Sequence, residues 1–145
     1  MEAITLLEEV SPELSEVLRN GGTTIFFDSV LENQKHPNRQ TVAYFDPKSN
    51  RIGLHPLLMH SSAAVRATHL AHEAFHVMMR EQNIVDEVEE EYRTRQAEIE
   101  VWKKLKERYP SEKDAALDSW EWMIDNLPKS TVKDYLRTEL GYGRR

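Results

Sequence analysis

The sequence predicts an α+β fold, with strands gathered in the first third of the chain and long helices after them. Three short segments between residues 23 and 54 are rich in β-branched and aromatic residues, as strands are. Most of the remaining chain repeats its apolar residues with the helical period. Strands and helices that are segregated in this way are typical of α+β proteins. The length of 145 residues fits one domain, residues 1–145.

The N-terminal part should contain a helix followed by three strands. Residues 2–19 are amphipathic, and Pro12 marks a helix start or break near Ser11. The sequence Gly21-Gly22 ends this helix. The strands are expected at residues 23–27, 41–45 and 51–54.

The connections between the strands carry residues that favour turns and loops. His36-Pro37-Asn38 predicts a loop between the first and second strands. The segment DPKSN at residues 46–50 has the chemistry of a tight turn. The second and third strands should therefore form a hairpin, and we expect a small, mostly antiparallel sheet.

Two long helices are predicted after the strands. Ser61 or Ser62 can cap the first, and Gln82-Asn83 ends it. The second runs from about residue 86 to 108 and stops before Pro110.

Two shorter helices complete the chain. Ser111 is expected to cap one that ends before Pro128. Ser130 is expected to cap the other, which ends at Gly141.

The composition limits the class of protein. The formal net charge of −6 disfavours nucleic acid as a partner. The absence of cysteine excludes disulfides and thiol chemistry, and it leaves His, Asp and Glu as metal ligands. The first residues lack the features of a secretory signal, and no apolar run approaches the roughly 18 residues of a membrane span. We therefore expect a cytoplasmic protein that binds neither nucleic acid nor membranes.

Residues 72–76, with the sequence HEAFH, match the H-E-x-x-H pattern. His72 and His76 are four residues apart, so they share one helix face and their imidazoles can converge on one ion. Glu73 would reach a water on that ion rather than the ion itself. Zinc lowers the pKa of such a water to about 7, and a carboxylate can take its proton. The alternative is an ordinary helical protein in which this short pattern is accidental.

A third ligand should be acidic and come from the next helix, because no histidine follows His76. Glu91 and Glu98 lie at the edge of the buried face of that helix, seven residues apart. In an antiparallel hairpin Glu91 returns to the level of the two histidines. Glu98 lies about 10 Å further along, nearer His69. We therefore favour Glu91 as the third ligand of one zinc ion per chain. Glu98 is the alternative ligand, or a residue that orients a ligand imidazole.

Three further residues near this group are candidates for supporting roles. His69 is interpreted as a structural histidine rather than a fourth ligand. Arg95 could pair with the neighbouring glutamates of its helix, or it could polarise a substrate carbonyl. Tyr92 could donate a hydrogen bond to an oxyanion, although its periodicity favours the core.

Other polar and aromatic residues are interpreted as structural. Glu87, Glu89 and Glu90 suit the solvated start of a helix, and Glu90 points away from the buried face. The segment WEWM at residues 120–123 is interpreted as a core anchor of the C-terminal helices, with a binding surface as the alternative.

The pairing of HEAFH with a following glutamate helix resembles the gluzincins, metalloproteases whose third zinc ligand is a Glu on the next helix. The stretch EYRTRQAEIEVW at residues 91–102 is similar to the E-x-x-A-x-x-x-E pattern of small metallopeptidases, with Thr94 where Ala is usual. This resemblance assigns the ligand to Glu91 and a supporting place to Glu98.

The size and layout of the chain also resemble the minigluzincins, and the likeness covers about residues 41–105. It implies a minimal zincin-like fold, in which a small sheet packs on the active-site helix and the glutamate helix. Some minigluzincins are held latent by their own C-terminal segment. By analogy, residues 111–145 could cover the cleft.

Together these features predict zinc-dependent hydrolysis of peptide bonds, with Glu73 as general base and then general acid. A peptide or protein substrate would lie along an edge strand such as residues 41–45. The alternative is a latent or inactive metal-binding interaction or regulatory protein that retains the motif. No sequence feature indicates the oligomeric state.

Overall fold

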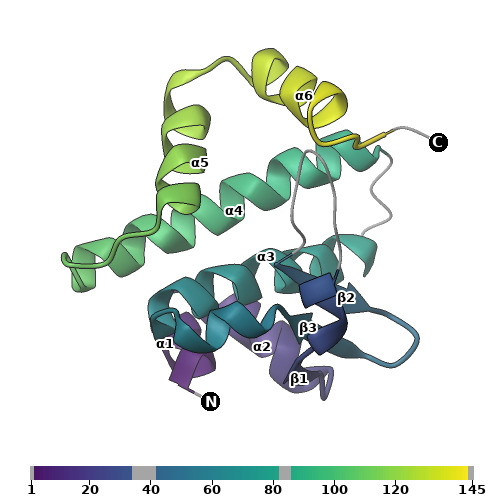
Figure 1. Ribbon diagram of the computed structural model, residues 1–145, viewed down its shortest axis with the longest axis vertical. Coiled ribbons are helices and arrows are strands. Elements are labelled where there is room, and N and C mark those ends of the chain that lie inside the picture. Colours follow the sequence, from purple (N-terminus) through teal and green to yellow (C-terminus); the bar gives the residue numbers. More distant parts are fainter. Residues whose placement is uncertain (1, 34–41, 82–85, 144–145) are drawn as a thin grey trace.

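A computed structural model describes residues 2–33, 42–81 and 86–143 of the chain. The described residues form six α-helices, two short 3₁₀ helices and one three-stranded sheet, which confirms the predicted α+β class (Figure 1). In chain order the elements are α1 (Glu2–Val10), α2 (Pro12–Asn20), β1 (Thr24–Phe27), η1 (Ser29–Asn33), β2 (Ala43–Asp46), β3 (Arg51–Leu54), η2 (Pro56–His60), α3 (Ala63–Glu81), α4 (Glu87–Arg108), α5 (Ala115–Asn126) and α6 (Lys129–Thr138).

The predicted N-terminal helix is broken at Ser11, as Pro12 suggested. Ser11 leaves the helical region of backbone space, with φ −151° and ψ 79°, and Pro12 opens α2. Proline cannot donate a backbone hydrogen bond to the preceding turn and its ring clashes there, so it is tolerated only in the first turn of a new helix. Two short helices, rather than one long helix, therefore pack beside α3.

The sheet has the strand order β1-β3-β2, with β3 in the centre. β2 and β3 pair antiparallel, as the predicted hairpin requires. β1 takes the other edge of β3 and pairs parallel to it. The expected antiparallel arrangement therefore holds for only one of the two strand pairs. Within the described chain, this order leaves β2 as an edge strand.

The predicted loop at residues 36–38, the start of the second strand at Thr41 and the helix end at Gln82-Asn83 lie outside the described residues. In the described part, no helix is both long enough and apolar enough to cross a membrane.

Two apolar clusters hold the helices together. The larger one joins α1, α2, β3, α3, the second half of α4 and the start of α5, and Trp102 is its largest fully buried side chain. The smaller one joins the start of α4 to α6 through Val88, Tyr92, Val132 and Leu136. Because both clusters use α4, this helix connects the N-terminal and C-terminal parts of the fold.

The C-terminal helices begin at different residues from those expected. Asp114, rather than Ser111, caps α5, and its side chain accepts a hydrogen bond from Leu117 N at 3.0 Å. A carboxylate also suits the positive end of the helix dipole. α6 begins after Pro128, two residues earlier than a Ser130 cap would place it, and it ends at Thr138. α5 leaves the far end of α4 and α6 returns over its first turns, so the two helices form an arch above α4 (Figure 1).

Gly53 on the central strand lies opposite Tyr44 on β2. A Cβ atom added at Gly53 would come within 2.3 Å of Tyr44 Cε1, well inside van der Waals contact. The ring has little freedom to move, because the Tyr44 hydroxyl donates a hydrogen bond to Asp28 and the ring packs edge-on against Phe26. Gly53 therefore makes room for Tyr44 across the sheet.

We predict that Gly53→Ala lowers the free energy of unfolding by about 1–3 kcal/mol, because the added methyl group displaces the Tyr44 ring. Chemical denaturation of the single and double variants with Tyr44→Ala measures this. The double variant should lose less than the sum of the two single losses, since the clash is gone. Additive losses would mean that Tyr44 does not restrict the position.

Candidate metal centre

α3 presents three histidines on one face. His69, His72 and His76 are three and four residues apart, a spacing that aligns side chains along one side of a helix. Ser62 caps the helix, since its Oγ accepts a hydrogen bond from Val65 N at 3.2 Å. The opposite face of α3 is buried in the larger apolar cluster, so the histidines are turned toward α4.

α4 presents Glu91, Arg95 and Glu98 toward α3, again four and three residues apart. The helix begins at the predicted place, because the Asp86 side chain accepts a hydrogen bond from Val88 N at 2.8 Å. Glu91 contacts His72 and His76, while Glu98 contacts His72 and His69. These contacts show that the helices run antiparallel and that each glutamate lies at the level predicted from the sequence.

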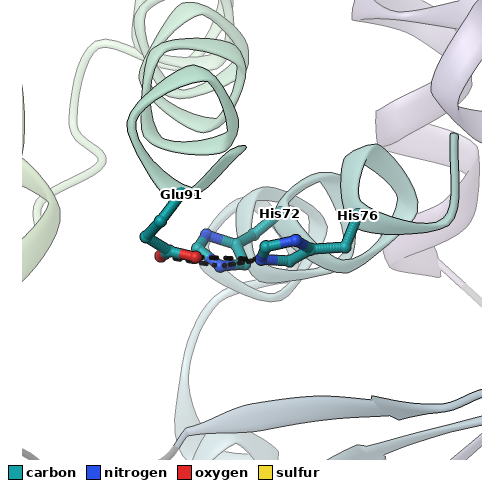
Figure 2. Close-up of side chains that lie close together, drawn as sticks. All are labelled: His72, His76 and Glu91. Carbon is teal, nitrogen blue, oxygen red and sulfur yellow. Dashed lines mark hydrogen bonds and ion pairs between the residues drawn. The ribbon is translucent and has the colours of Figure 1, made fainter. Parts of the chain in front are cut away.

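His72, His76 and Glu91 converge on one point between the helices (Figure 2). The two Nε2 atoms are 3.2 Å apart. Glu91 Oε2 lies 3.0 Å from His76 Nε2, and Glu91 Oε1 lies 3.4 Å from His72 Nε2. The Nε2 atoms of both imidazoles and the carboxylate oxygens of Glu91 thus face the same small volume.

These separations fit a bound metal ion. Ligand atoms at 2.0–2.1 Å from a tetrahedral zinc lie about 3.3 Å from one another. Two neutral imidazoles would not face each other through their lone pairs at this distance without a proton or cation between them. Glu91 Oε1 is buried, and within the described chain it has no well-aligned hydrogen bond. Two nitrogens and one carboxylate are a donor set that zinc accepts, with a fourth position left open.

The electrostatics of the group favour positive charge. Burial acts to lower the pKa of His72, but Glu91 and Glu98 outweigh it and raise this pKa to about 9. Burial acts to raise the pKa of Glu91, but His72, His76 and Arg95 lower it to about 2. The pKa of Glu98 is likewise lowered to about 2 against the effect of burial, mainly by Arg95 and His72. Both carboxylates are therefore ionised and attract a cation.

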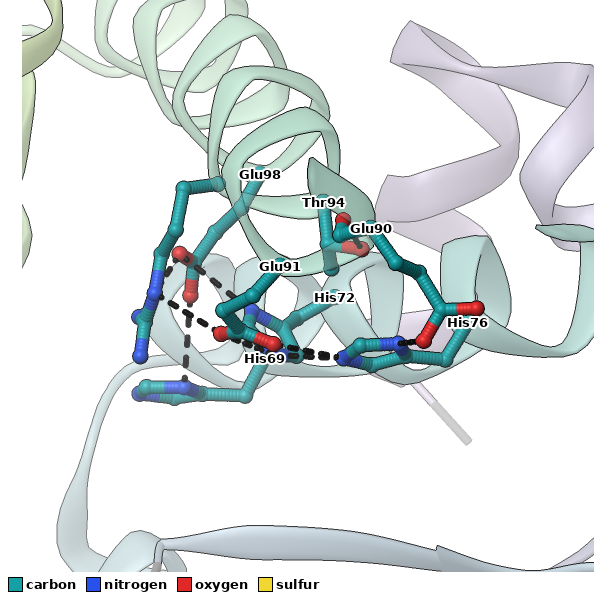
Figure 3. Close-up of polar contacts among 8 residues, drawn as sticks. His69, His72, His76, Glu90, Glu91, Thr94 and Glu98 are labelled. Atoms are coloured by element: carbon teal, nitrogen blue, oxygen red, sulfur yellow. Dashed lines mark hydrogen bonds and ion pairs between the residues drawn. The ribbon is translucent and has the colours of Figure 1, made fainter. Parts of the chain in front are cut away.

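Glu98 lies beside His72 and His69, at the level predicted from the sequence. Its Oε2 lies 3.5 Å from His72 Nδ1, the ring nitrogen that faces away from the convergence point (Figure 3). Its Oε1 lies 3.9 Å from His69 Nδ1. Arg95 bridges the two acids, with Nε 3.2 Å from Glu91 Oε1 and Nη1 3.0 Å from Glu98 Oε2. Carboxylates placed on the second nitrogen of a ligand imidazole fix the orientation of its ring.

Glu90 contacts His76, which the sequence did not predict. It was expected to point away into solvent, but its Oε2 lies 3.2 Å from His76 Nδ1 (Figure 3). Glu90 lies outside the buried face of α4, so the sequence pattern placed it in solvent. His76 of the facing helix, however, extends to the edge of that face and contacts Glu90. The antiparallel register that places Glu91 beside His76 also brings its neighbour Glu90 within reach.

A cavity of about 630 Å³ lies against the convergence point. Its lining includes the three site histidines, Glu73 and Glu91, together with residues of β2 and of the C-terminal arch. Glu73 is only 7% exposed, and burial raises the pKa of its carboxyl group. A carboxylate with a raised pKa can hold a proton more readily near neutral pH.

Tyr92 lies in an apolar cluster, as the periodicity of its helix favoured. Tyr92 belongs to the smaller apolar cluster, where Lys129 Nζ lies 5.2 Å from its ring centroid. The cavity lining, as far as the described residues define it, includes Tyr44, Tyr135 and Tyr142 but not Tyr92. The position of Tyr92 therefore agrees with the core interpretation and gives no support to an oxyanion role.

Comparisons with models of protein families, with curated protein sequences and with solved structures gave no match.

We predict that the purified chain, without a His-tag, binds about one zinc ion, and that His76→Ala removes this binding. Glu90→Gln should weaken zinc affinity about 10- to 100-fold, because a carboxylate on the second imidazole nitrogen raises the basicity of the ligand and fixes its ring. Elemental analysis gives the stoichiometry, and competition with a chelating indicator gives the affinity.

Glu87→Gln is the matched control for this measurement. Glu87 lines the same cavity near the start of α4, so the change removes the same charge without touching His76. Equal losses of affinity in the Glu87 and Glu90 variants would show a general effect of charge rather than a contact with His76.

Proposed function

We propose that this chain is a zinc-dependent peptidase of the gluzincin type, in which His72, His76 and Glu91 hold one zinc ion. The observation that carries the proposal is the convergence of these three side chains at separations that suit tetrahedral zinc. Glu73 directly follows His72 on α3, and it lines the adjoining cavity. Ligands, a buried carboxylate and an open volume thus occur together.

Each residue of the group has a defined chemical task in this proposal. Zinc would supply Lewis acidity, which lowers the pKa of a water molecule to about 7 and polarises a carbonyl group. Glu73 accepts a proton from the attacking water as the new C–O bond forms. It then donates that proton to the amine nitrogen as the C–N bond breaks. Glu98 and Glu90 contact the Nδ1 atoms of His72 and His76, respectively, and so orient the two rings toward the zinc.

The edge strand β2 offers a binding place for an extended peptide. Val42, Ala43, Tyr44 and Phe45 line the cavity, and β2 pairs with β3 on only one side in the described sheet. Backbone groups on the outer side of an edge strand can pair with the main chain of a bound peptide. The substrate would thus be held by its backbone, with the scissile bond near Glu73.

A second candidate is a metal-binding regulatory protein that is latent or does not turn over. The observation that favours it is the composition of the cavity wall, because residues of the C-terminal segment 111–145 contribute to it. They are Asp114, Ala116, Leu117, Trp120, Tyr135, Leu140 and Tyr142. A segment so close to the proposed metal would limit access of a large protein substrate more than that of a short peptide.

We predict that Glu73→Gln retains zinc but lowers kcat/KM for peptide hydrolysis about 10²- to 10⁴-fold, because an amide cannot transfer the proton. A panel of fluorogenic peptides, assayed with wild type and with the variant at matched zinc content, measures this. Arg93→Gln on the exposed side of α4 should leave hydrolysis unchanged. If wild type binds zinc and no hydrolysis of the panel depends on Glu73, the regulatory candidate replaces the peptidase.

A further inference from the structure

The indole ring of Trp120 covers the guanidinium group of Arg95. Arg95 Cζ lies 4.3 Å from the ring centroid, within the range in which a cation is attracted to the face of an aromatic ring. Trp120 belongs to α5, whereas Arg95 belongs to the face of α4 that contacts the histidines. The stack therefore connects the C-terminal arch to the candidate metal centre.

The other contacts of Arg95 lead directly to the candidate ligands. Its Nε and Nη1 atoms face Glu91 and Glu98 at 3.2 Å and 3.0 Å. Burial acts to lower the pKa of Arg95, but the two carboxylates raise it, so the group stays charged. A guanidinium is planar and presents its donors in a rigid fork. Here Nη1 donates a hydrogen bond to Glu98 Oε2, while Nε lies within ion-pair distance of Glu91 Oε1. Its side chain is only 17% exposed.

α5 has attachments to the rest of the fold besides Trp120, which itself packs against the smaller apolar cluster. Leu117 is 1% exposed in the larger apolar cluster, and Asp118 accepts a hydrogen bond from Trp102 Nε1 at 2.9 Å. Lys106 adds ion pairs with Asp118 and Glu121. Trp120 itself packs edge-on against Tyr135 of α6, with 5.8 Å between the ring centroids. Its ring is therefore held in place by the arch and directed at Arg95.

We infer that Trp120 is a positioning residue of the metal centre. Its ring holds the Arg95 guanidinium, which in turn holds Glu91 against His72 and His76 and holds Glu98 behind His72. The inference rests on the proposed function in one respect, that this group binds zinc. The new element is that Trp120, a residue of the C-terminal arch, determines the geometry of the site through Arg95.

The test compares zinc affinity across three variants of the full chain by competition with a chelating indicator. Trp120→Leu removes the ring face and should weaken zinc binding about three- to tenfold. Trp120→Phe keeps a ring and should retain most of the affinity. Trp122→Leu is the matched control, because Trp122 lies on the same helix and is 59% exposed; it should bind zinc as wild type does.

Cobalt substitution provides a readout that a purely structural role would not change. The visible absorption of bound Co²⁺ depends on ligand geometry, so Trp120→Leu should alter the spectrum, whereas Trp120→Phe and Trp122→Leu should not. In an Arg95→Lys background the effect of Trp120→Leu should shrink, because a lysine cannot present the fork that the ring fixes.

Hydrogen exchange on the wild-type chain tests the same coupling without a substitution. If the docking of α5 strengthens zinc binding, then bound zinc must strengthen the docking of α5 by the same free energy. Amides of Ala115–Asn126 should therefore gain more protection on addition of zinc than those of Glu2–Asn20, which lie on the other side of α3.

The outcomes separate the two proposals. If wild type binds no zinc, the proposed function fails and this inference fails with it. If wild type binds zinc and a folded Trp120→Leu keeps the wild-type affinity and cobalt spectrum, only the inference is overturned. If Trp120→Leu does not fold, equal protection of α5 and α1–α2 in wild type overturns it.

Discussion

Negative charge buried between α3 and α4 constrains the arrangement of the whole molecule. Glu91 and Glu98 are almost fully enclosed, and a carboxylate left without a partner in such a place would be strongly destabilising. Arg95 and the imidazoles compensate the two acids, and the imidazoles come from the opposite helix. Because the partners are divided between the helices, these ion pairs favour the observed relative position of α3 and α4. A metal ion would meet the same requirement for positive charge.

The remaining elements serve to maintain this helix pair. α1 and α2 pack beside α3, and the sheet contacts α3 through β2 (Figure 1). The histidines of α3 contact α4 and line the cavity. α5 and α6 attach to opposite ends of α4, through Trp102 and Asp118 at one end and through Val88 and Tyr92 at the other. α4 therefore has neighbours on several sides, which explains how one helix can carry both buried charges and two apolar contacts.

The sequence was most informative where a periodic pattern met a clear helix boundary. The turn expected between the two long helices, from about residue 81 to about residue 85, set their relative level, and equal rise per residue then placed Glu91 opposite His72 and His76. Glu90 was misjudged because a projection of one helix cannot represent the side chains of another. The parallel place of β1 and the caps of α5 and α6 depend on contacts between distant residues, which local patterns do not report.

The phase of the two facing helices also has an evolutionary consequence. Site residues recur on α3 at positions 69, 72 and 76 and on α4 at 91, 95 and 98. Inserting one residue between Glu91 and Glu98 would rotate the second acid by about 100° around the helix and move it by about 1.5 Å along it. Glu98 would then leave the face shared with Glu91. Natural variation in chain length should therefore accumulate outside these two spans, where an added residue leaves the alignment of both helices unchanged.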